Sequence, residues 1–417
     1  MIGVIADDFT GATDIAGLMA RTGADVRMHG GIPATPPAGI GAVEVIALKC
    51  RTAPVDQAVA DTTAALEWLL AHGARQIYWK YCSTFDSTDQ GNIGPVAEAL
   101  MARLGADHTV YCPAFPENGR TVYQGHLFVG DALLSDSPMR HHPLTPMTDS
   151  NLMRLLDPQV TQPVGLIPLD QVRGGADAVA RARADLVARG IAHLIADATA
   201  DADLATLGQA VADAPLLTGG SAFAAAAYGP DLRQLTDTSP LPHLPAGPAI
   251  VLSGSCSAAT RAQVARFRAS GATVIDVMPS EIATDGAASL IDAVMQALGD
   301  QPVLVTSTAE PDALADVQTA LGRDAAGALV EGALAAVAQA ARARGATRIV
   351  VAGGETSGAI TLALRAHDLR VGPEIAPGVP WCFADDGAGS FALALKSGNF
   401  GGADFFTDAL AALERLR

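Results

Sequence analysis

The sequence predicts an α/β protein of two domains, each a mainly parallel sheet flanked by helices, with ligands bound in the cleft between them. Two observations lead to this prediction. Short apolar runs alternate with Ala-rich stretches of helical spacing along most of the 417 residues, as in parallel α/β sheets. Residues 236–248 are rich in proline and lack periodicity, which is typical of a linker. We therefore place the domains at residues 1–240 and 241–417.

The first domain begins with a strand at residues 2–6 and repeats the strand–turn–helix pattern. The further strands are predicted at 43–48, 76–81, 109–112, 164–168, 193–196 and 215–218. Helices are predicted between them, for example at 55–72, 93–104 and 174–189. Residues 113–147 interrupt the pattern, because they are rich in Gly, Pro, Asn, Asp and His. We expect an irregular, functional loop there, since loops of this length are uncommon in compact domains.

The second domain repeats the pattern after the linker. Its strands are predicted at 249–252, 273–277, 302–306, 348–352 and 391–395, with a helix at 258–270 after the first. Three of these strands end in Gly/Ser-rich turns, whereas the strands of the first domain end mainly in charged and hydroxyl side chains. The two domains are therefore expected to bind different ligands.

Composition limits the partners. Lys and Arg number 27 against 44 Asp and Glu, a formal net charge of −17, which argues against nucleic acid or anionic membranes as partners. The N-terminus lacks the features of a signal peptide, and no apolar stretch is long enough to span a bilayer. The five cysteines contain no CxxC pair, so we expect reduced thiols without a zinc site, in a cytoplasmic protein.

The strand at 2–6 ends in two adjacent carboxylates, Asp7 and Asp8, followed by Thr10, Gly11 and a helix. Ligands of parallel α/β sheets gather beyond the carboxyl ends of the strands, and N–H groups at a helix N-terminus suit an anion. Asp7 and Asp8 are therefore our candidate catalytic residues. The alternative is a solvated turn with Asp as the helix N-cap.

Polar side chains also follow other strands of the first domain. The candidates for substrate binding are Arg51, Lys80, Ser83, Thr84, Asp86, Asn118, Arg120 and Arg140. The cations suit a carboxylate, and the other side chains suit several hydroxyl groups, so the set favours a small polyhydroxy acid. For each arginine taken alone, a surface ion pair is the more common case.

The second domain carries the Gly/Ser-rich strand ends at 253–257, 352–358 and 396–402. Glycines allow close backbone approach, and N–H groups at such turns cradle anions, so we predict phosphate binding. The candidates are Ser255, Ser257, Gly353, Gly354, Glu355, Thr356, Ser357, Gly358, Lys396 and Gly398. The sequence contains no GxxxxGK[ST] motif and no GxGxxG after its first strand, which excludes a P-loop and disfavours a Rossmann site.

Taken together, the segments ADDFTGATDIAG, SGSCS, GGETSGAI and KSGNFGG resemble the four-carbon acid sugar kinase family over essentially the whole chain. The segments KYCSTFDSTDQGNIG and GDALLSDSPMRHHPLTPM are similar to its 3-oxo-tetronate kinase branch. The resemblance implies an N-terminal domain for the acid sugar and a C-terminal domain for ATP, with Mg²⁺. It also implies transfer of the γ-phosphate to the C4 hydroxyl of a 3-oxo-tetronate, giving the 4-phosphate and ADP.

Within that reaction we expect Asp8 or Asp7 to accept the proton of the substrate hydroxyl, with Asp8 preferred. The other carboxylate would cap the helix or orient a cation. Two alternatives stay open: a kinase of a non-oxidised acid such as threonate or erythronate, and a sugar-acid-binding protein without catalysis. The metal ligands, the substrate stereochemistry at C2 and a homo-oligomeric state are also left open.

Overall fold

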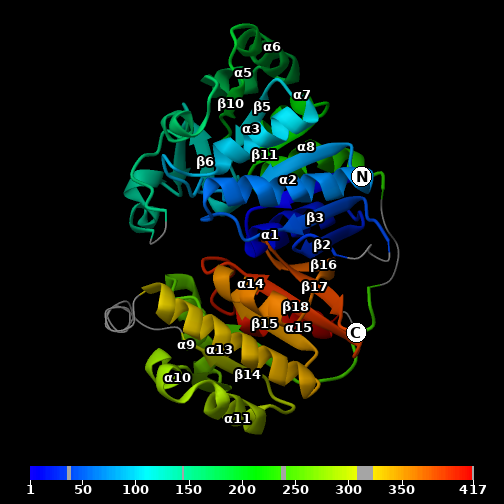
Figure 1. Cartoon of the computed structure of the whole chain (residues 1–417), viewed down its shortest axis with the longest axis vertical. Helices are drawn as coiled ribbons and strands as arrows, with labels where there is room; N and C mark the ends of the chain where they lie inside the picture. Colours follow the sequence, from blue (N-terminus) through cyan, green and yellow to red (C-terminus); the bar gives the residue numbers. More distant parts are fainter. Residues whose placement is uncertain (35–38, 143–144, 236–240, 308–322, 416–417) are drawn as a thin grey trace. The chain divides into compact units, whose positions relative to one another are not determined.

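The computed structural model describes residues 1–34, 39–142, 145–235, 241–307 and 323–415. The chain divides into two compact units, Met1–Thr238 and Ser239–Arg417, called here the N-terminal and the C-terminal unit (Figure 1). The predicted boundary after residue 240 falls at residues 236–240, which lie outside the described residues, so its position stays a prediction.

The N-terminal unit contains a sheet in which every described strand pair is parallel. Its order is β2 (Val26–Gly30), β3 (Val43–Ala47), β1 (Ile2–Ala6), β4 (Gln76–Lys80), β11 (Leu216–Gly219), β5 (Thr109–Cys112), β10 (His193–Ala196) and β9 (Val164–Ile167). In β1, Ala6 is in register with Ala47 of β3 and Lys80 of β4. The segments that follow these three strands therefore leave the sheet side by side.

Two series of packed helices flank this sheet (Figure 1). One consists of α1 (Phe9–Ala20), α8 (Ser221–Leu232), α7 (Asp201–Val211) and α6 (Ala176–Ala188), and the other of α2 (Val55–Ala71) and α3 (Ile93–Leu104). Two short helices, α4 (Leu152–Leu156) and α5 (Leu169–Arg173), complete the unit. Nearly all residues of α1 are buried, so this helix is fixed on the sheet directly after the two carboxylates.

The prediction that residues 113–147 form an irregular loop is wrong in part. The segment contains a small antiparallel sheet of β6 (Arg120–Tyr123), β7 (His126–Val129) and β8 (Ala132–Leu133). Gln124 and Gly125 join β6 to β7 with φ values of 52° and 68°, as a tight hairpin turn requires. Their N–H groups donate to the buried Asp197 carboxylate. A distant carboxylate thus stabilises a hairpin whose own sequence signal is weak.

The C-terminal unit has its own sheet. The order is β13 (Thr273–Asp276), β14 (Val303–Thr306), β12 (Ala249–Ser253), β15 (Arg348–Ala352), β18 (Ser390–Lys396), β17 (Val379–Asp385) and β16 (Asp368–Ala376). The first five strands are parallel, and β17 is antiparallel to both of its neighbours. The helices among the described residues of this unit are α9 (Ala258–Ala269), α10 (Pro279–Asp285), α11 (Ala288–Ala297), α13 (Arg323–Ala343), α14 (Gly354–Ala363) and α15 (Phe405–Glu414).

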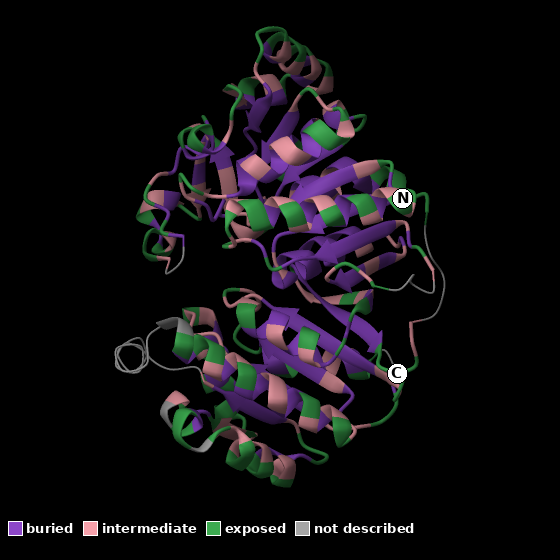
Figure 2. Ribbon diagram, in the orientation of Figure 1, coloured by how far each residue is buried: buried purple, intermediate pink, exposed green. Residues whose placement is uncertain are grey.

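The predicted fold class is confirmed, since both units are mainly parallel α/β sheets. Their strands form buried cores, and the helices expose their outer faces (Figure 2). In the C-terminal unit, Trp381, Phe405 and Phe406 belong to one apolar cluster, and the Trp381 indole donates to the Ala409 carbonyl. Every helix in the described part of the chain is too short or too polar to cross a bilayer.

Candidate functional site

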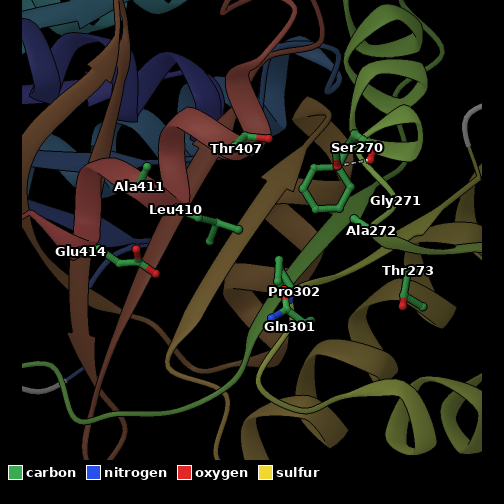
Figure 3. Close-up of a pocket in the computed structure, with 11 residues that line it drawn as sticks. Ser270, Gly271, Ala272, Thr273, Gln301, Pro302, Thr407, Leu410, Ala411 and Glu414 are labelled. Carbon is green, nitrogen blue, oxygen red and sulfur yellow. Dashed lines mark hydrogen bonds between the residues drawn. The ribbon is translucent and has the colours of Figure 1, made fainter.

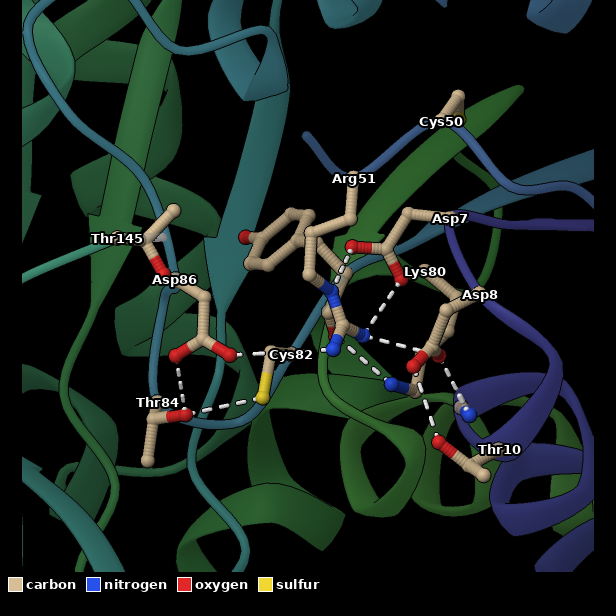
Figure 4. Close-up of polar contacts among 12 residues, drawn as sticks. Asp7, Asp8, Thr10, Cys50, Arg51, Lys80, Cys82, Thr84, Asp86 and Thr145 are labelled. Carbon is tan, nitrogen blue, oxygen red and sulfur yellow. Dashed lines mark hydrogen bonds and ion pairs between the residues drawn. The ribbon is translucent and has the colours of Figure 1, made fainter. Parts of the chain in front are cut away.

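The centre of the N-terminal unit's site is the Arg51 guanidinium, which meets three carboxylates (Figure 4). Arg51 Nε lies 2.8 Å from Asp7 Oδ2, and Nη2 lies 2.9 Å from both Asp7 Oδ1 and Asp8 Oδ1. Nη1 lies 3.8 Å from Asp86 Oδ2, beyond hydrogen-bond distance. The strand ends of β1, β3 and β4 thus converge as the sequence predicted, and one nitrogen of Arg51 stays available to a ligand.

Asp8 is the N-cap of α1. Its carboxylate accepts the Gly11 N–H at 2.6 Å and the Thr10 hydroxyl at 2.9 Å. A Cβ on Gly11 would lie 2.4 Å from Asp8 Oδ1 and 3.1 Å from Lys80 Nζ. Only glycine therefore lets the first turn of α1 approach both charges, which explains the Asp-Asp-Phe-Thr-Gly order of the opening segment.

The two carboxylates differ in exposure and in basicity. The Asp8 side chain is 21% exposed and that of Asp7 only 3%. Burial raises the pKa of Asp7 above its usual value, although Arg51 opposes this shift. Burial would also raise the pKa of Asp8, but Arg51, Lys80 and its two hydrogen bonds to α1 outweigh it and lower that pKa. Asp8 is therefore the ionised carboxylate that a ligand can reach.

Lys80 is buried at the end of β4, and its Nζ donates to the Tyr81 carbonyl at 2.8 Å. Burial and Arg51 have the two largest effects on the pKa of Asp8, the first raising it and the second lowering it. The charge of Lys80 has the next largest effect and also lowers this pKa. Lys80 and Arg51 therefore oppose three carboxylates, which leaves this cluster with an excess of negative charge. An anionic substrate would need further cations close by.

The segment after β4 carries Ser83, Thr84 and Asp86. Thr84 Oγ1 donates to Asp86 Oδ1 at 2.6 Å and lies 2.9 Å from Cys82 Sγ. Ser83 is partly buried on the same turn. Phe85, fully buried between Thr84 and Asp86, has a φ of 53°. A bulky residue in this region is strained, and its backbone conformation turns Asp86 toward Arg51.

Three further candidates lie in the segment that contains the small antiparallel sheet. Arg120 Nη1 donates to the Asn118 carbonyl. Arg120 Nε and Asn118 Nδ2 are buried donors that lack a hydrogen-bond partner among the described residues, as expected of groups that await a ligand. Arg140 is exposed and donates to the Ser135 carbonyl in its own turn, so the structure does not bring it into the Arg51 cluster.

In the C-terminal unit, the three Gly/Ser-rich turns follow adjacent strands. Ser253 of β12 is in register with Ala352 of β15, which is in register with Lys396 of β18. A Cβ on Gly398 would lie 2.5 Å from Ser255 Oγ, and one on Gly254 would lie 2.2 Å from Thr356 Oγ1. The turns therefore touch one another, and we call them the glycine cradle.

Two helices begin at the glycine cradle. Ser257 caps α9 by accepting the Thr260 N–H, and its hydroxyl donates to the Gly398 carbonyl at 2.6 Å. Gly353 precedes α14 with a φ of 126°, a backbone conformation that favours glycine. Glu355 is exposed, whereas Thr356, Ser357 and Gly358, near the start of α14, are buried. Two helix N-termini at one strand edge suit a polyanion such as a nucleotide.

Lys396 is buried beneath the glycine cradle. Its Nζ donates to the Ser397 and Gly398 carbonyls, each at 2.9 Å, and to Thr260 Oγ1 at 3.1 Å. Burial lowers the pKa of this amine to about 7. In its protonated form the amine can donate to all three acceptors, so Lys396 stabilises the Gly398 turn. Sequence reasoning missed Thr260, whose position inside an ordinary-looking helix gave no signal.

A cavity of about 370 Å³ lies elsewhere in the C-terminal unit (Figure 3). Its lining includes Thr273, where β13 begins, and Pro302, just before β14, together with Leu410 of α15. It therefore lies at the amino ends of the strands, away from the glycine cradle. Within the described residues, no group of three or more His, Cys, Asp or Glu side chains is arranged to hold a metal ion.

Both units match described domain families. Residues 2–227 match a sugar-binding N-terminal domain, and residues 250–406 match a nucleotide-binding C-terminal domain. Several curated relatives, including the following two, are named 3-oxo-tetronate kinase. The one from Cupriavidus necator is 51% identical and covers 99% of this chain and 97% of its own. The one from Pseudomonas fluorescens is 50% identical with the same coverage.

Solved structures agree on the fold. A protein of Salmonella typhimurium, which carries the name of a tRNA synthase, is 42% identical with a TM-score of 0.86 over 98% of both chains. A Haemophilus influenzae protein is 40% identical with a TM-score of 0.79, covering 98% of this chain and 99% of its own. These matches extend across both units.

Proposed function

We infer the function from one premise: the chain belongs to the four-carbon acid sugar kinase family, in the branch of the 3-oxo-tetronate kinases. It transfers the γ-phosphate of ATP to the C4 hydroxyl of a 3-oxo-tetronate, giving the 4-phosphate and ADP. The observation that carries this reading is identity of about half the residues with named kinases along nearly the whole chain. The residues of both candidate sites therefore lie within the part of the chain that aligns with these kinases.

In the N-terminal unit, Arg120 and Asn118 are proposed to hold the substrate carboxylate. Their buried, unpartnered donors, Nε and Nδ2, support this role, because a buried donor without an acceptor is costly. Arg51 offers Nη1, and Lys80 adds positive charge beside it. Ser83, Thr84 and Asp86 are proposed to bind the substrate hydroxyls. Arg140 could join them only if the substrate reaches its exposed turn.

Asp8 is proposed to orient the C4 hydroxyl and accept its proton. It is ionised, and its side chain is more exposed than that of Asp7. A lowered pKa makes it a weak base, but phosphoryl transfer depends mainly on positioning and charge stabilisation. Asp7 holds Arg51 in place through two hydrogen bonds. This division follows the expectation that two adjacent carboxylates take different roles.

The glycine cradle is proposed to bind the ATP phosphates. Its backbone approaches so closely that a Cβ at Gly398 would meet Ser255, and the buried Ser357 hydroxyl has no hydrogen-bond partner among the described residues. Bound ATP supplies the phosphoryl group, and Mg²⁺ would neutralise its charge. Mg²⁺ is commonly held by one or two carboxylates plus phosphates, so its binding does not need a cluster of three acidic or His side chains, which the described residues lack. Binding in a cleft between the units, which would exclude water, stays a prediction.

The test is ADP release by the purified chain with ATP and a panel of four-carbon acids. We expect turnover with a 3-oxo-tetronate and a kcat/KM lower by about 100-fold or more for threonate and erythronate. These acids carry a C3 hydroxyl on a tetrahedral carbon in place of the planar C3 carbonyl, so polar groups placed for the carbonyl are mispaired. Phosphorus NMR of the product should report a phosphate monoester on C4. Preference for threonate or erythronate would assign the chain to a different substrate, and binding without turnover would contradict a kinase.

A further inference from the structure

Asn92 occupies the N-cap position of α3, but its side chain forms no cap hydrogen bond. An N-cap asparagine normally accepts the N–H of the second or third helical residue. Here the second is Gly94, whose N–H donates to Gln159 Oε1 at 3.2 Å. The third is Pro95, which has no N–H. Helix capping therefore does not explain an asparagine at this position.

The Asn92 amide instead reaches the loop that follows β3. Its Nδ2 donates to the Cys50 carbonyl at 2.7 Å, with the Ala53 and Arg51 carbonyls at 3.1 Å and 3.3 Å. Asn92 is only 4% exposed. One buried NH₂ group thus gathers three carbonyls of the loop that carries Arg51, which lies about forty residues earlier in the chain.

The same loop is held on its other side by Asp7. The Cys50 and Arg51 N–H groups both donate to the Asp7 carbonyl, at 3.0 Å and 3.2 Å. The amides of the loop are thus tied to the end of β1, and its carbonyls to the start of α3. Arg51 has a long side chain, and its two hydrogen bonds to Asp7 keep their geometry only if the backbone that carries it is held in place.

We propose that Asn92 is a positioning residue of the acid-sugar site: it holds the loop from Cys50 to Ala53 so that Arg51 keeps its contacts with Asp7 and Asp8. The inference rests on the proposed function in assigning Arg51 to the acid-sugar site. This positioning role requires a side chain at residue 92 that donates hydrogen bonds to the loop carbonyls. Aspartate caps helices as well as asparagine does, but its carboxylate would face three carbonyl oxygens and repel the loop.

Asn92→Asp therefore separates positioning from capping. We expect it to raise the KM for the acid sugar about tenfold or more, with the KM for ATP within about twofold of the wild-type value. The matched control is Asn151→Asp. Asn151 is also a buried N-cap asparagine, but its Oδ1 does accept a helix N–H, from Arg154 at 3.0 Å. It should change either KM by less than about twofold.

A double-mutant cycle with Arg51→Ala tests whether Asn92 acts through Arg51. If it does, Asn92→Asp should add less than about twofold to the defect of Arg51→Ala. If the double variant instead raises the KM for the acid sugar by the product of the two single-variant fold-increases, the inference is overturned. If Arg51→Ala alone leaves acid-sugar kinetics intact, the assignment of Arg51 in the proposed function is wrong instead. Should Asn92→Asp not fold, Asn92→Ala, which removes the donor without adding a charge and loses no cap hydrogen bond, takes its place in the cycle.

Discussion

Arg51 meets Asp7 through two hydrogen bonds, from Nε at 2.8 Å and from Nη2 at 2.9 Å, and the same Nη2 reaches Asp8 at 2.9 Å. One guanidinium therefore joins two adjacent carboxylates of unequal exposure. Asp7 is almost enclosed, whereas Asp8 keeps a face toward solvent and caps α1. The shared contact with Arg51 does not make the two carboxylates equivalent.

The first prediction concerns this inequality. Asp8→Asn should fold with a loss of about 1 kcal/mol or less, because asparagine also caps helices, while kcat falls by roughly 10²–10⁴ from loss of the proton acceptor. Asp7→Asn should instead lower the free energy of unfolding by up to about 3–5 kcal/mol, the scale for breaking a buried ion pair. Urea denaturation and steady-state kinetics on both variants provide the measurement. A wild-type kcat in Asp8→Asn would move the base elsewhere, with Asp86 the next candidate.

The second prediction tests the glycine cradle. Gly398→Ala places a Cβ 2.5 Å from Ser255 Oγ and 3.1 Å from Ser257 Oγ. The turns must move apart, and we expect the KM for ATP to rise about tenfold while the KM for the acid sugar is unchanged. Gly332→Ala in α13 is the control, because a Cβ there meets nothing within 4 Å. If the two variants have the same KM for ATP, the proposal that the glycine cradle binds the nucleotide is wrong.

The third prediction separates two arginines. Arg120→Ala removes a charged donor from the proposed carboxylate site, which should cost about 1.5–3 kcal/mol of acid-sugar binding, or roughly 10- to 150-fold in affinity. Arg140→Ala, on an exposed turn, should have a much smaller effect. Isothermal titration with the acid sugar measures both. A larger loss in Arg140→Ala would show that the substrate sits nearer the 138–141 turn than we propose.

Several elements could be read from the sequence because their signals are local. The strands β1, β3 and β4 are mainly apolar, although β3 contains Glu44 and β4 begins with Gln76 and ends with Lys80. The polar residues just after these strands converge because neighbouring parallel strands end at one edge. Among the described strands, β2, β16 and β17 of the two large sheets were missed, as were β6, β7 and β8 of the small antiparallel sheet. In β2, polar Arg27 and His29 break the apolar run, and burial of His29 depends on its contact with Glu44 of β3, at 2.5 Å.

The sequence did not predict which side chains of the site pair with one another. Arg51 was expected to hold a substrate carboxylate, but its geometry is set by Asp7, which lies 44 positions earlier. The role of Asn92 depends on Gln159, a residue of a separate segment, satisfying Gly94. Sequence pattern reports which side chains reach the strand edge, whereas pairing among them depends on tertiary contacts.

The last prediction concerns Lys396 and has two parts. Lys396→Met removes the three hydrogen bonds that stabilise the Gly398 turn, so the KM for ATP should rise while acid-sugar kinetics stay unchanged. The second part is a pH dependence. The pKa of this amine is about 7 in the folded protein, against the ordinary value of 10.5 expected in the unfolded chain.

Between these two pKa values the unfolded chain binds a proton at Lys396 that the folded chain does not. The free energy of unfolding therefore rises with pH across this window. Lys396→Met lacks this titration, so its free energy of unfolding should fall progressively behind the wild-type value as the pH increases from 7 to 10.5. Urea denaturation of both proteins at several pH values measures the difference, and the other titrating groups cancel in it. A constant difference across the window would mean that the ammonium keeps its proton in the folded state, held by Thr260 and the two carbonyls.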